Sequence, residues 1–213
     1  MCSKSSYLIK ILIILLMGVF PIGMFGFNLY EDNDTVDVWE LTFEENINYP
    51  PVPASVQSIV KKYIYKEYQN LQKKGLKVKL IRDDEAILIS LPIDDFFKNN
   101  DVKNILRSGE EYLKYFSNYL KIKELYRVVF CVHHDNSLNG ENADNLTNER
   151  VLTLVDWMIN NCVNGSNIVP YSMGNEYPIT SNVTKEGRKK NRRLDVYIFP
   201  GKTMLDIAKD NKL

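Results

Sequence analysis

Cysteine and histidine are scarce in this sequence. The 213 residues include three cysteines and two histidines. The chain therefore has at most one intramolecular disulfide bond, and it has no third histidine to complete a histidine-based metal site. Cys131 and Cys162 are the two residues that a bridge would join, and each also lies in an apolar stretch where buried free thiols are common. No functional prediction depends on whether these cysteines form a disulfide bond or remain free thiols.

An excess of charge of either sign is also absent. Lysine and arginine together number 27, and aspartate and glutamate together also number 27. The whole chain therefore has no electrostatic attraction to nucleic acid or to an anionic membrane surface, and any binding driven by charge has to be local. With 45% hydrophobic and 11% aromatic residues, the chain is long enough for one packed domain and an appendage.

Charged residues are missing from Ile11 to Phe27, a run of 17 residues. Lys4 and Lys10 precede this run and the acidic stretch YEDNDTVD follows it, an order that directs the rest of the chain out of the cytoplasm. The run is short for a spanning helix and contains Pro21. Residues 1–27 are therefore interpreted as either a cleaved signal peptide or a single membrane anchor.

Two further segments precede the main domain. Residues 28–54 are acidic and then proline-rich without a sustained hydrophobic period, which predicts a tether. Residues 55–75 repeat apolar side chains at helical spacing, with Ser55 available as N-cap and Gly75 just past the end. This pattern predicts an N-terminal helix, which either packs on the domain or serves as a docking element for another envelope protein.

The remaining chain alternates between strand and helix patterns. Helices are expected at about 102–121 and at 147–161, the second with Thr147 as N-cap. The predicted strands are 76–84, 85–92, 125–132, 166–174 and 192–200, with a polar loop at 175–190 and a tail at 200–213. This order predicts one sheet with helices packed on one face.

Both histidines stand next to an aspartate, in the segment His133 to Asp135. Neighbouring strand residues point to opposite faces, so His133 and His134 cannot bind one metal ion while the strand continues. Cys131 shares a face with His133, but no orienting partner or electropositive setting for a catalytic thiolate is apparent. The segment predicts neither a metal site nor a catalytic one, and no cofactor is expected.

Six cations lie within the nine residues from Lys185 to Arg193. Such runs often indicate a nucleic-acid patch. Export of the chain, its zero net charge and the lack of interleaved aromatic residues argue against that partner. The remaining interpretations are a solvated loop or the recognition of an anionic ligand, and the carboxylates of peptidoglycan stems are such a ligand.

Two segments resemble the signatures of one protein family. A strand that ends in His-x-Asp is followed by LTNERV, which is similar to the Leu-Ser-x-x-Arg-Ala start of a helix. Further on, NVTKEGRKKNRRLDVYI closely resembles the Asn-x-Thr-x-x-Gly-Arg-x-x-Asn-Arg-Arg signature before a last strand. Both signatures belong to the OmpA-like peptidoglycan-binding domain, and the resemblance covers residues 76–199. It implies an α+β fold, a β-α-β-α-β-β sandwich with one mixed sheet covered by helices, preceded here by the extra helix and the membrane-directed segment.

The resemblance also implies a binding site for diaminopimelate in the peptidoglycan stem. In the family, a strand-end aspartate and a helix arginine fifteen positions later hold this residue, and Asp135 and Arg150 have that spacing. The ligand centre is a zwitterion, so an acceptor meets its ammonium and a guanidinium fork grips its carboxylate. Arg150 is expected in the first turn of its helix, where free N–H groups assist carboxylate binding. The implied supporting residues are Asn99 or Asn100, His134, Thr147, Arg188, Asn191 and Arg192.

Three positions depart from the family pattern. Val132 stands in place of a glycine, His134 in place of a threonine, and Ala143 in place of an asparagine. The bulkier His134 either narrows the pocket or adds a contact to a carboxylate. The resemblance therefore supports the predicted fold more directly than it supports the predicted ligand.

These features together predict a non-catalytic envelope protein that binds peptidoglycan and tethers a membrane to the wall. Its expected location is the periplasmic side of a Gram-negative envelope, anchored in a membrane or associated with the outer membrane. The alternative is an interaction subunit of an envelope assembly, or a self-associating one, whose domain no longer binds the wall. A proton-driven stator is not expected, because it needs an acidic residue within the membrane-directed run Ile11 to Phe27, which has none. A wall hydrolase is not expected either, because the motif region contains no paired carboxylates.

Overall fold

The computed structural model of the chain describes residues 36–161 and 165–213. The predicted signal peptide or anchor at residues 1–27 lies outside this range, as does Cys162. In the part of the chain that is described, no helix is both long enough and apolar enough to cross a membrane. Residues Leu41–Leu213 form one compact unit, and the fold below is that of this unit.

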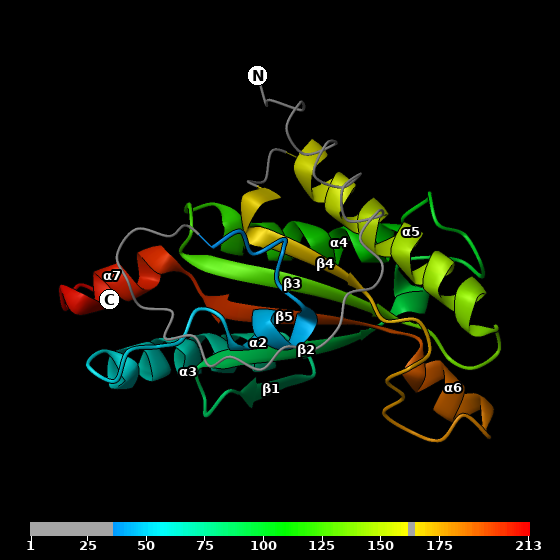
Figure 1. Cartoon of the computed structure of the whole chain (residues 1–213), viewed down its shortest axis with the longest axis horizontal. Coiled ribbons are helices and arrows are strands. Elements are labelled where there is room, and N and C mark those ends of the chain that lie inside the picture. Colours follow the sequence, from blue (N-terminus) through cyan, green and yellow to red (C-terminus); the bar gives the residue numbers. More distant parts are fainter. Residues whose placement is uncertain (1–35, 162–164) are drawn as a thin grey trace. The chain divides into compact units, whose positions relative to one another are not determined.

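The described strands form a single mixed sheet (Figure 1). The strands are β1 Val78–Ile81, β2 Ala86–Pro92, β3 Tyr126–His133, β4 Ile168–Ser172 and β5 Arg193–Pro200. Their order in the sheet is β1-β2-β5-β3-β4, and only β3 and β4 are parallel among these neighbours. The predicted hairpin is present, because β1 and β2 pair directly, and Asp83 and Asp84 in its turn adopt positive φ angles of 53° and 66°.

Helices precede, separate and follow the strands. They are α2 Phe43–Asn48, α3 Gln57–Lys73, α4 Arg107–Phe116, α5 Gly140–Asn160, α6 Lys185–Asn191 and α7 Lys202–Lys209, with short 3-10 helices η1 Ile93–Asp95, η2 Ser117–Leu120 and η3 Gly165–Asn167. The predicted α+β fold with one mixed sheet and helices is confirmed. The helix expected at residues 55–75 is α3, and the tail contains α7, whose Met204, Leu205 and Ala208 are buried.

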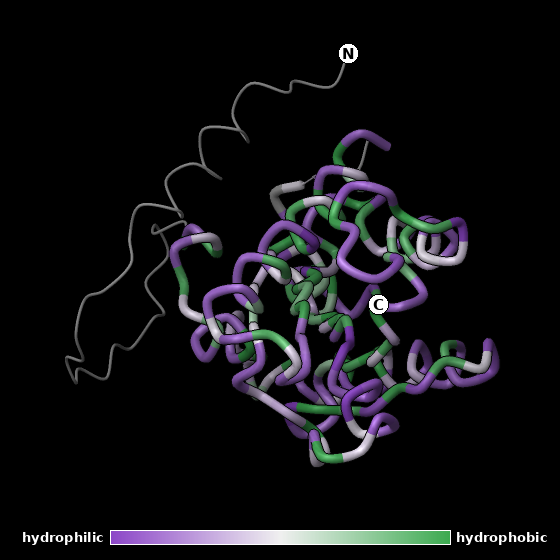
Figure 2. Tube along the Cα trace, turned by 90° about the vertical axis from the view of Figure 1, so that its right-hand side faces the viewer, coloured by the Kyte–Doolittle hydropathy of each residue, from purple (hydrophilic) through white to green (hydrophobic). Residues whose placement is uncertain are grey.

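The hydrophobic core lies between the sheet and the layer of α3, α4 and α5. Side chains alternate along β3, so Phe130 packs against Phe116, the last residue of α4, while Arg127, three positions earlier, points to the opposite face. All eight residues of β3 are buried, because helices or loops cover both faces of this central strand. Figure 2 shows the hydrophobic segments gathered in the interior and hydrophilic turns around them.

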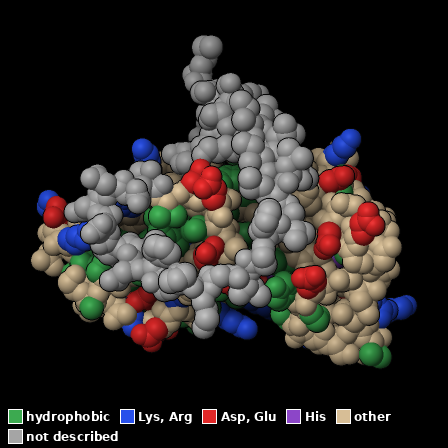
Figure 3. Space-filling model, viewed as in Figure 1, with side chains coloured by type: hydrophobic (Ala, Val, Ile, Leu, Met, Phe, Trp, Pro, Cys, Tyr) green, Lys and Arg blue, Asp and Glu red, His purple; other side chains and the backbone are tan. Residues whose placement is uncertain are grey.

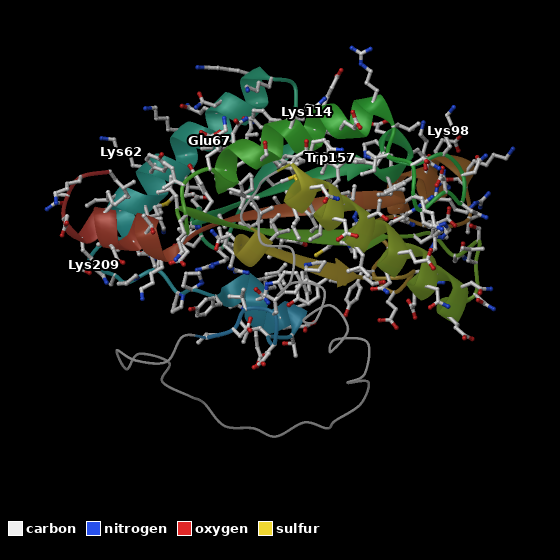
Figure 4. All side chains as sticks on the ribbon, turned by 90° about the horizontal axis from the view of Figure 1, so that it is seen from above. Lys62, Glu67, Lys98, Lys114, Trp157 and Lys209 are labelled. Atoms are coloured by element: carbon white, nitrogen blue, oxygen red, sulfur yellow. The ribbon has the colours of Figure 1, made fainter. Side chains whose placement is uncertain are left out.

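The second face of the sheet carries a helix that the sequence prediction lacks. Within the stretch predicted as a tether, Thr42 caps α2 through a capping box with Glu45. Arg127 on β3 donates hydrogen bonds to the side chain and the backbone carbonyl of Asn46 and to the carbonyl of Tyr49. The tether prediction is therefore wrong for residues 41–54, and helices do not lie on one face alone (Figure 4).

Helix α5 begins two turns earlier than predicted. Its N-cap is Asn139, whose side chain accepts a hydrogen bond from the backbone N–H of Asn142. Thr147 lies inside the helix and is not its N-cap, and Arg150 lies well beyond the first turn. The first two turns read GENADNL, in which Ala143 and Leu146 are buried but the other residues are glycine or polar, so the sequence shows no clear helical period there.

Two other boundaries also differ. The helix predicted at 102–121 begins at Arg107, because the Asp101 carboxylate accepts hydrogen bonds from the backbone N–H groups of Lys103 and Asn104 and forms a turn instead. These bonds, with one from the Asn104 side chain, lower the pKa of Asp101 to about 2. The predicted loop at 175–190 contains the start of α6, capped by Thr184.

Candidate functional site

The predicted site residues lie where β2 and β3 end and β5 begins. Pro92 of β2 and His133 of β3 both pair with Arg193, the first residue of β5. This register brings the segments that follow β2 and β3 next to the residue that precedes β5. Asp94, Asp135 and Arg192 therefore meet although they are far apart in sequence. Figure 1 shows α6 and the N-terminal part of α5 at this same end of the sheet.

Asp135 is the most enclosed member of this group. Its side chain has no exposed area. Its Oδ1 atom accepts a hydrogen bond of 2.8 Å from the backbone N–H of Ser137, and its Oδ2 atom accepts one of 2.6 Å from Nη1 of Arg192. Burial alone would raise the pKa of the Asp135 carboxyl, but these bonds hold that pKa below its ordinary value. Asp135 is thus an ionised, buried acceptor.

Arg192 joins two carboxylates. Besides its bond to Asp135, its Nε and Nη2 atoms donate to Oδ1 and Oδ2 of Asp94 at 3.3 and 3.0 Å. The hydrogen bond with Asp94 is the main cause of a raised pKa for Arg192. The side chains of Arg192 and Asp94 are 28% and 40% exposed, so they form the outer surface above the enclosed Asp135. A ligand that approaches Asp135 meets Arg192 first.

Arg150 is buried and bound to backbone carbonyls. Its Nε donates to the carbonyl of Asp101 at 3.1 Å, its Nη2 donates to the carbonyl of Asn99, and its guanidinium lies 5.2 Å from the Phe97 ring centre. Burial lowers the pKa of Arg150, and the nearby charges of Asp94 and Arg192 act on it in opposite directions. Because Arg150 is not in the first turn of α5, the expected help from free helical N–H groups is not available to it. Asp94, Asp135, Arg150 and Arg192 are called the end-of-sheet cluster below.

His134 lies directly beside this cluster. Its backbone N–H donates to the carbonyl of Gly174 at 2.6 Å, and its Nδ1 is 3.6 Å from Oδ1 of Asp135. The residue is buried, so it fills the space next to Asp135 where the family pattern has the smaller threonine. Its Nδ1 also lies 2.9 Å from the backbone carbonyl of Asp135, and whether His134 narrows the ligand pocket or contacts a ligand carboxylate stays a prediction.

The other predicted supporting residues have structural contacts. Thr147 is buried, and its hydroxyl bonds to Ser172 and accepts from the N–H of Gly174, which ties α5 to the end of β4. Asn191 bonds to the backbone at Ile179 and Thr180, and Arg188 donates to the carbonyls of Asn182 and Val183. These contacts shape the loop before β5, and none joins the end-of-sheet cluster. Asn99 contributes its carbonyl to Arg150, and Asn100 is exposed.

Asp94 is the site residue that sequence reasoning missed. It follows β2 in η1 and lies 98 positions before Arg192. The only signal was an acidic pair, Asp94 and Asp95, directly after a predicted strand. Because its partner depends on β5 lying between β2 and β3, the pairing could not be deduced from local sequence.

His133 belongs to a separate buried network on the face of the sheet that α2 partly covers. Its Nε2 lies 3.2 Å from Oδ2 of Asp195, which also accepts from Nε of Arg193 at 2.8 Å, while Oδ1 accepts from the Ser90 hydroxyl at 2.6 Å. Burial is the main reason that the pKa of His133 is lowered, although the contact with Asp195 opposes this effect. His133 and His134 thus have different partners and do not form one site.

Comparison with solved structures defines the class of fold first. The chain is similar to a MotB-like protein from Desulfovibrio vulgaris, with a TM-score of 0.58 and 13% identity over 68% of this chain and 99% of that one. It is also similar to a cell wall anchor of the type VI secretion system from Pseudomonas aeruginosa, with a TM-score of 0.52 and 17% identity over 62% and 93% of the two chains. At these identities the similarity shows the fold alone.

Sequence comparison gives the family. The model of the OmpA family matches residues 96–192. The putative lipoprotein YfiB of Escherichia coli is 30% identical over 112 residues, which are 51% of this chain and 69% of YfiB. The peptidoglycan-binding protein ArfA of Mycobacterium tuberculosis is 31% identical over 101 residues, which are 46% of this chain but only 30% of ArfA. The chain belongs to the OmpA family.

Proposed function

We propose that the chain binds peptidoglycan without covalent chemistry, through the zwitterionic centre of diaminopimelate in the peptide stem. The observation that carries this proposal is the end-of-sheet cluster, in which an ionised aspartate and a buried arginine lie within one group of charges. ArfA, a relative in sequence, is named a peptidoglycan-binding protein, which supports the same ligand class. No bond is made or broken, so no turnover is required.

Binding requires Arg192 to move. Since the Asp135 side chain has no exposed area, the ligand ammonium reaches it only by replacing Nη1 of Arg192. In the ligand-free arrangement Asp94 also holds Arg192, and this second ion pair is weakened when Arg192 moves away from Asp135. Arg150 uses its Nε and Nη2 on carbonyls and keeps further N–H donors for the ligand carboxylate. On binding, the ligand zwitterion thus replaces an internal ion pair, the one between Arg192 and Asp135.

A single stem should be held weakly. Two charge-assisted contacts contribute roughly 3 to 6 kcal/mol, and a dissociation constant of about 1 mM corresponds to about 4 kcal/mol. Displacing Arg192 from Asp135 reduces the net gain further. Retention at the wall then depends on the high local density of stems and on attachment of the protein to a membrane through residues 11–27, which makes rebinding effectively intramolecular. We place the domain on the periplasmic side of the envelope on this basis.

The test compares Asp135→Asn and Arg150→Lys with the parent chain in detergent. Asp135→Asn removes the charge that pairs with the ligand ammonium, and Arg150→Lys removes the guanidinium fork but keeps its positive charge, so affinity for a diaminopimelate-containing tripeptide should fall at least about tenfold. Calorimetric titration measures this, and co-sedimentation with purified sacculi measures retention. Asp84→Asn in the β1–β2 turn makes the same chemical change at an exposed site and should have no effect.

Thermal unfolding of each variant separates lost binding from lost folding. Folded Asp135→Asn and Arg150→Lys proteins that bind tripeptide and sacculi as well as the parent would contradict the proposal.

A second candidate function is that of an interaction subunit whose domain no longer binds the wall. The fully enclosed Asp135 favours it, as does Tyr65 on α3, which is 50% exposed and stacks on Tyr68. Helix α3 otherwise packs on β1, β2 and α7, so it is part of the domain. A parent chain that binds neither tripeptide nor sacculi, yet forms intermolecular cross-links from Tyr65, would establish this alternative.

A further inference from the structure

A second recess with no assigned role lies between α2, α5 and the end of β4. Its volume is about 460 Å³, within the range of small-ligand pockets of roughly 300 to 1,000 Å³. Aromatic rings contribute to its lining, from Phe43 on α2, Tyr171 on β4 and Tyr177 in the following loop. None of these residues belongs to the end-of-sheet cluster. This recess is called the α2–α5 pocket.

The floor of the α2–α5 pocket is fixed by bonds that do not involve a ligand. The hydroxyl of Tyr171 donates to the carbonyl of Leu41 at 2.7 Å and accepts from the Asn46 amide at 2.6 Å. Phe43 packs edge to face on the Tyr171 ring, with centroids 5.4 Å apart. Gly174 has a φ of +46°, and a Cβ atom there would lie 1.9 Å from the Asp144 carboxylate. Because Gly174 has no side chain, the Asp144 carboxylate has room to lie at the wall of the pocket.

The side chains at the rim of the pocket, in contrast, are polar and available to a ligand. It carries the carboxylates of Glu44, Asp144 and Glu176 and the amides of Asn145 and Asn148. Within the described residues, none of these side chains makes a hydrogen bond or an ion pair. Carboxylates and amides accept from several hydroxyl or N–H donors, and amides also donate. Figure 3 shows acidic side chains gathered over the N-terminal half of α5.

The charge of the pocket restricts its ligand. Among the described residues that line the pocket, three carry carboxylates and none is a lysine or an arginine. The carboxylates of a peptide stem would be repelled there. A neutral ligand with many O–H and N–H donors and an apolar ring face would satisfy the rim and stack on the aromatic rings. In peptidoglycan, that description fits the N-acetylated sugars of the glycan strand.

We propose that the α2–α5 pocket binds an N-acetylated sugar of the glycan strand whose stem occupies the end-of-sheet cluster. This inference rests on the proposed stem binding and adds a second subsite to it. Asp144 at the pocket and Arg150 in the cluster are six residues apart on α5, which is about 9 Å along the helix axis. An extended stem tripeptide, with diaminopimelate as its third residue, spans about 10 Å. The distance between the two subsites along α5 therefore matches the distance between the sugar and the diaminopimelate of an extended stem.

The experiment titrates the full chain in detergent with a diaminopimelate-containing tripeptide, with the disaccharide that carries the same tripeptide, and with an oligomer of N-acetylglucosamine alone. The disaccharide-tripeptide should bind about five- to tenfold more tightly than the tripeptide. Tyr177→Ala should abolish this difference and leave tripeptide affinity unchanged, because the substitution removes a ring at the pocket and keeps the backbone carbonyl that accepts a hydrogen bond from Arg193. Tyr65→Ala is the matched control, since Tyr65 and Tyr177 are 50% and 49% exposed.

The sugar oligomer separates the two proposals. Its binding, followed by ligand-observed NMR, should persist in Asp135→Asn and be lost in Tyr177→Ala. If the oligomer binds in this way but the tripeptide does not bind the parent, the pocket is supported and the stem site is wrong. If the tripeptide binds and the disaccharide adds nothing, or if Tyr177→Ala keeps the full difference, the pocket proposal is overturned.

Discussion

At the scale of single residues, the main feature is that one arginine is shared by two carboxylates. Arg192 holds Asp135 from outside while Asp94 holds Arg192. The sequence predicted Asp135, Arg150 and Arg192 because family signatures mark them. It did not predict Asp94, whose role follows from the register of three strands. Thr147 and Asn191, which the signatures mark as supporting residues, bond to Ser172 and to the backbone before β5, and their part in ligand binding stays a prediction.

The Asp94→Asn substitution should strengthen stem binding. The ion pair between Asp94 and Arg192 is partly exposed and stabilises the closed arrangement by about 0.5 to 1 kcal/mol. Without it, Arg192 leaves Asp135 more easily and is free for the ligand carboxylate, so affinity for the tripeptide should rise about two- to fivefold. Calorimetry at low salt measures this, with Asp95→Asn as the control. A fall in affinity would show that Asp94 contacts the ligand directly.

His133 should make folding stability depend on pH. Its pKa in the folded chain lies below the ordinary value of 6.5 because the ring is buried and lies near the positive charge of Arg193, although the contact with Asp195 opposes this lowering. As the pH falls below 6.5, the unfolded chain binds a proton that the folded chain does not, so stability decreases, by at most about 1.4 kcal/mol per pH unit. Urea unfolding between pH 7.5 and 5.5 should show this slope in the parent and a smaller one in His133→Gln. Equal slopes in both proteins would contradict the assignment.

At the scale of elements, hydrophobic patterns predicted all five described strands, because β2, β3, β4 and β5 carry buried apolar residues and β1 carries partly buried ones. Local patterns could not reveal that β5 lies between β2 and β3, since that arrangement depends on contacts distant in sequence. They also missed α2 and the start of α5. A helix of six residues is marginal by itself, so α2 owes its presence to tertiary bonds with Arg127 and Tyr171.

Asn46→Ala should therefore detach α2 from the sheet. Asn46 is fully buried, accepts from Arg127 and donates to the Tyr171 hydroxyl. Its loss leaves buried donors and acceptors without partners, which costs about 1 to 3 kcal/mol of stability. Urea denaturation measures the change in the free energy of unfolding. Asn48→Ala in the same helix is the control, because Asn48 bonds only to the exposed carbonyl of Glu44. Similar effects of both substitutions would show that α2 is held by packing rather than by these bonds.

At the scale of the whole molecule, zero net charge conceals an uneven distribution. The α2–α5 pocket is lined by carboxylates, whereas exposed cations such as Lys98 and Lys189 flank the segments that form the end-of-sheet cluster. A polymer that carries carboxylates on each stem and neutral sugars along its backbone matches both regions. If both proposed subsites bind peptidoglycan, this uneven distribution favours one orientation of the domain on the wall.

The double variant Lys98→Glu/Lys189→Glu should lose retention on sacculi more than affinity for a single tripeptide. These cations act on many stems at a distance, and that attraction is screened within about 10 Å at 0.1 M salt and about 3 Å at 1 M. Retention of the parent should therefore fall as salt rises and approach that of the variant. Lys62→Glu/Lys66→Glu on α3 changes the net charge equally, and Lys62 lies at the other end of the domain from Lys98 (Figure 4). If both double variants lose retention equally, attraction depends on total charge, and the wall does not select this end of the domain.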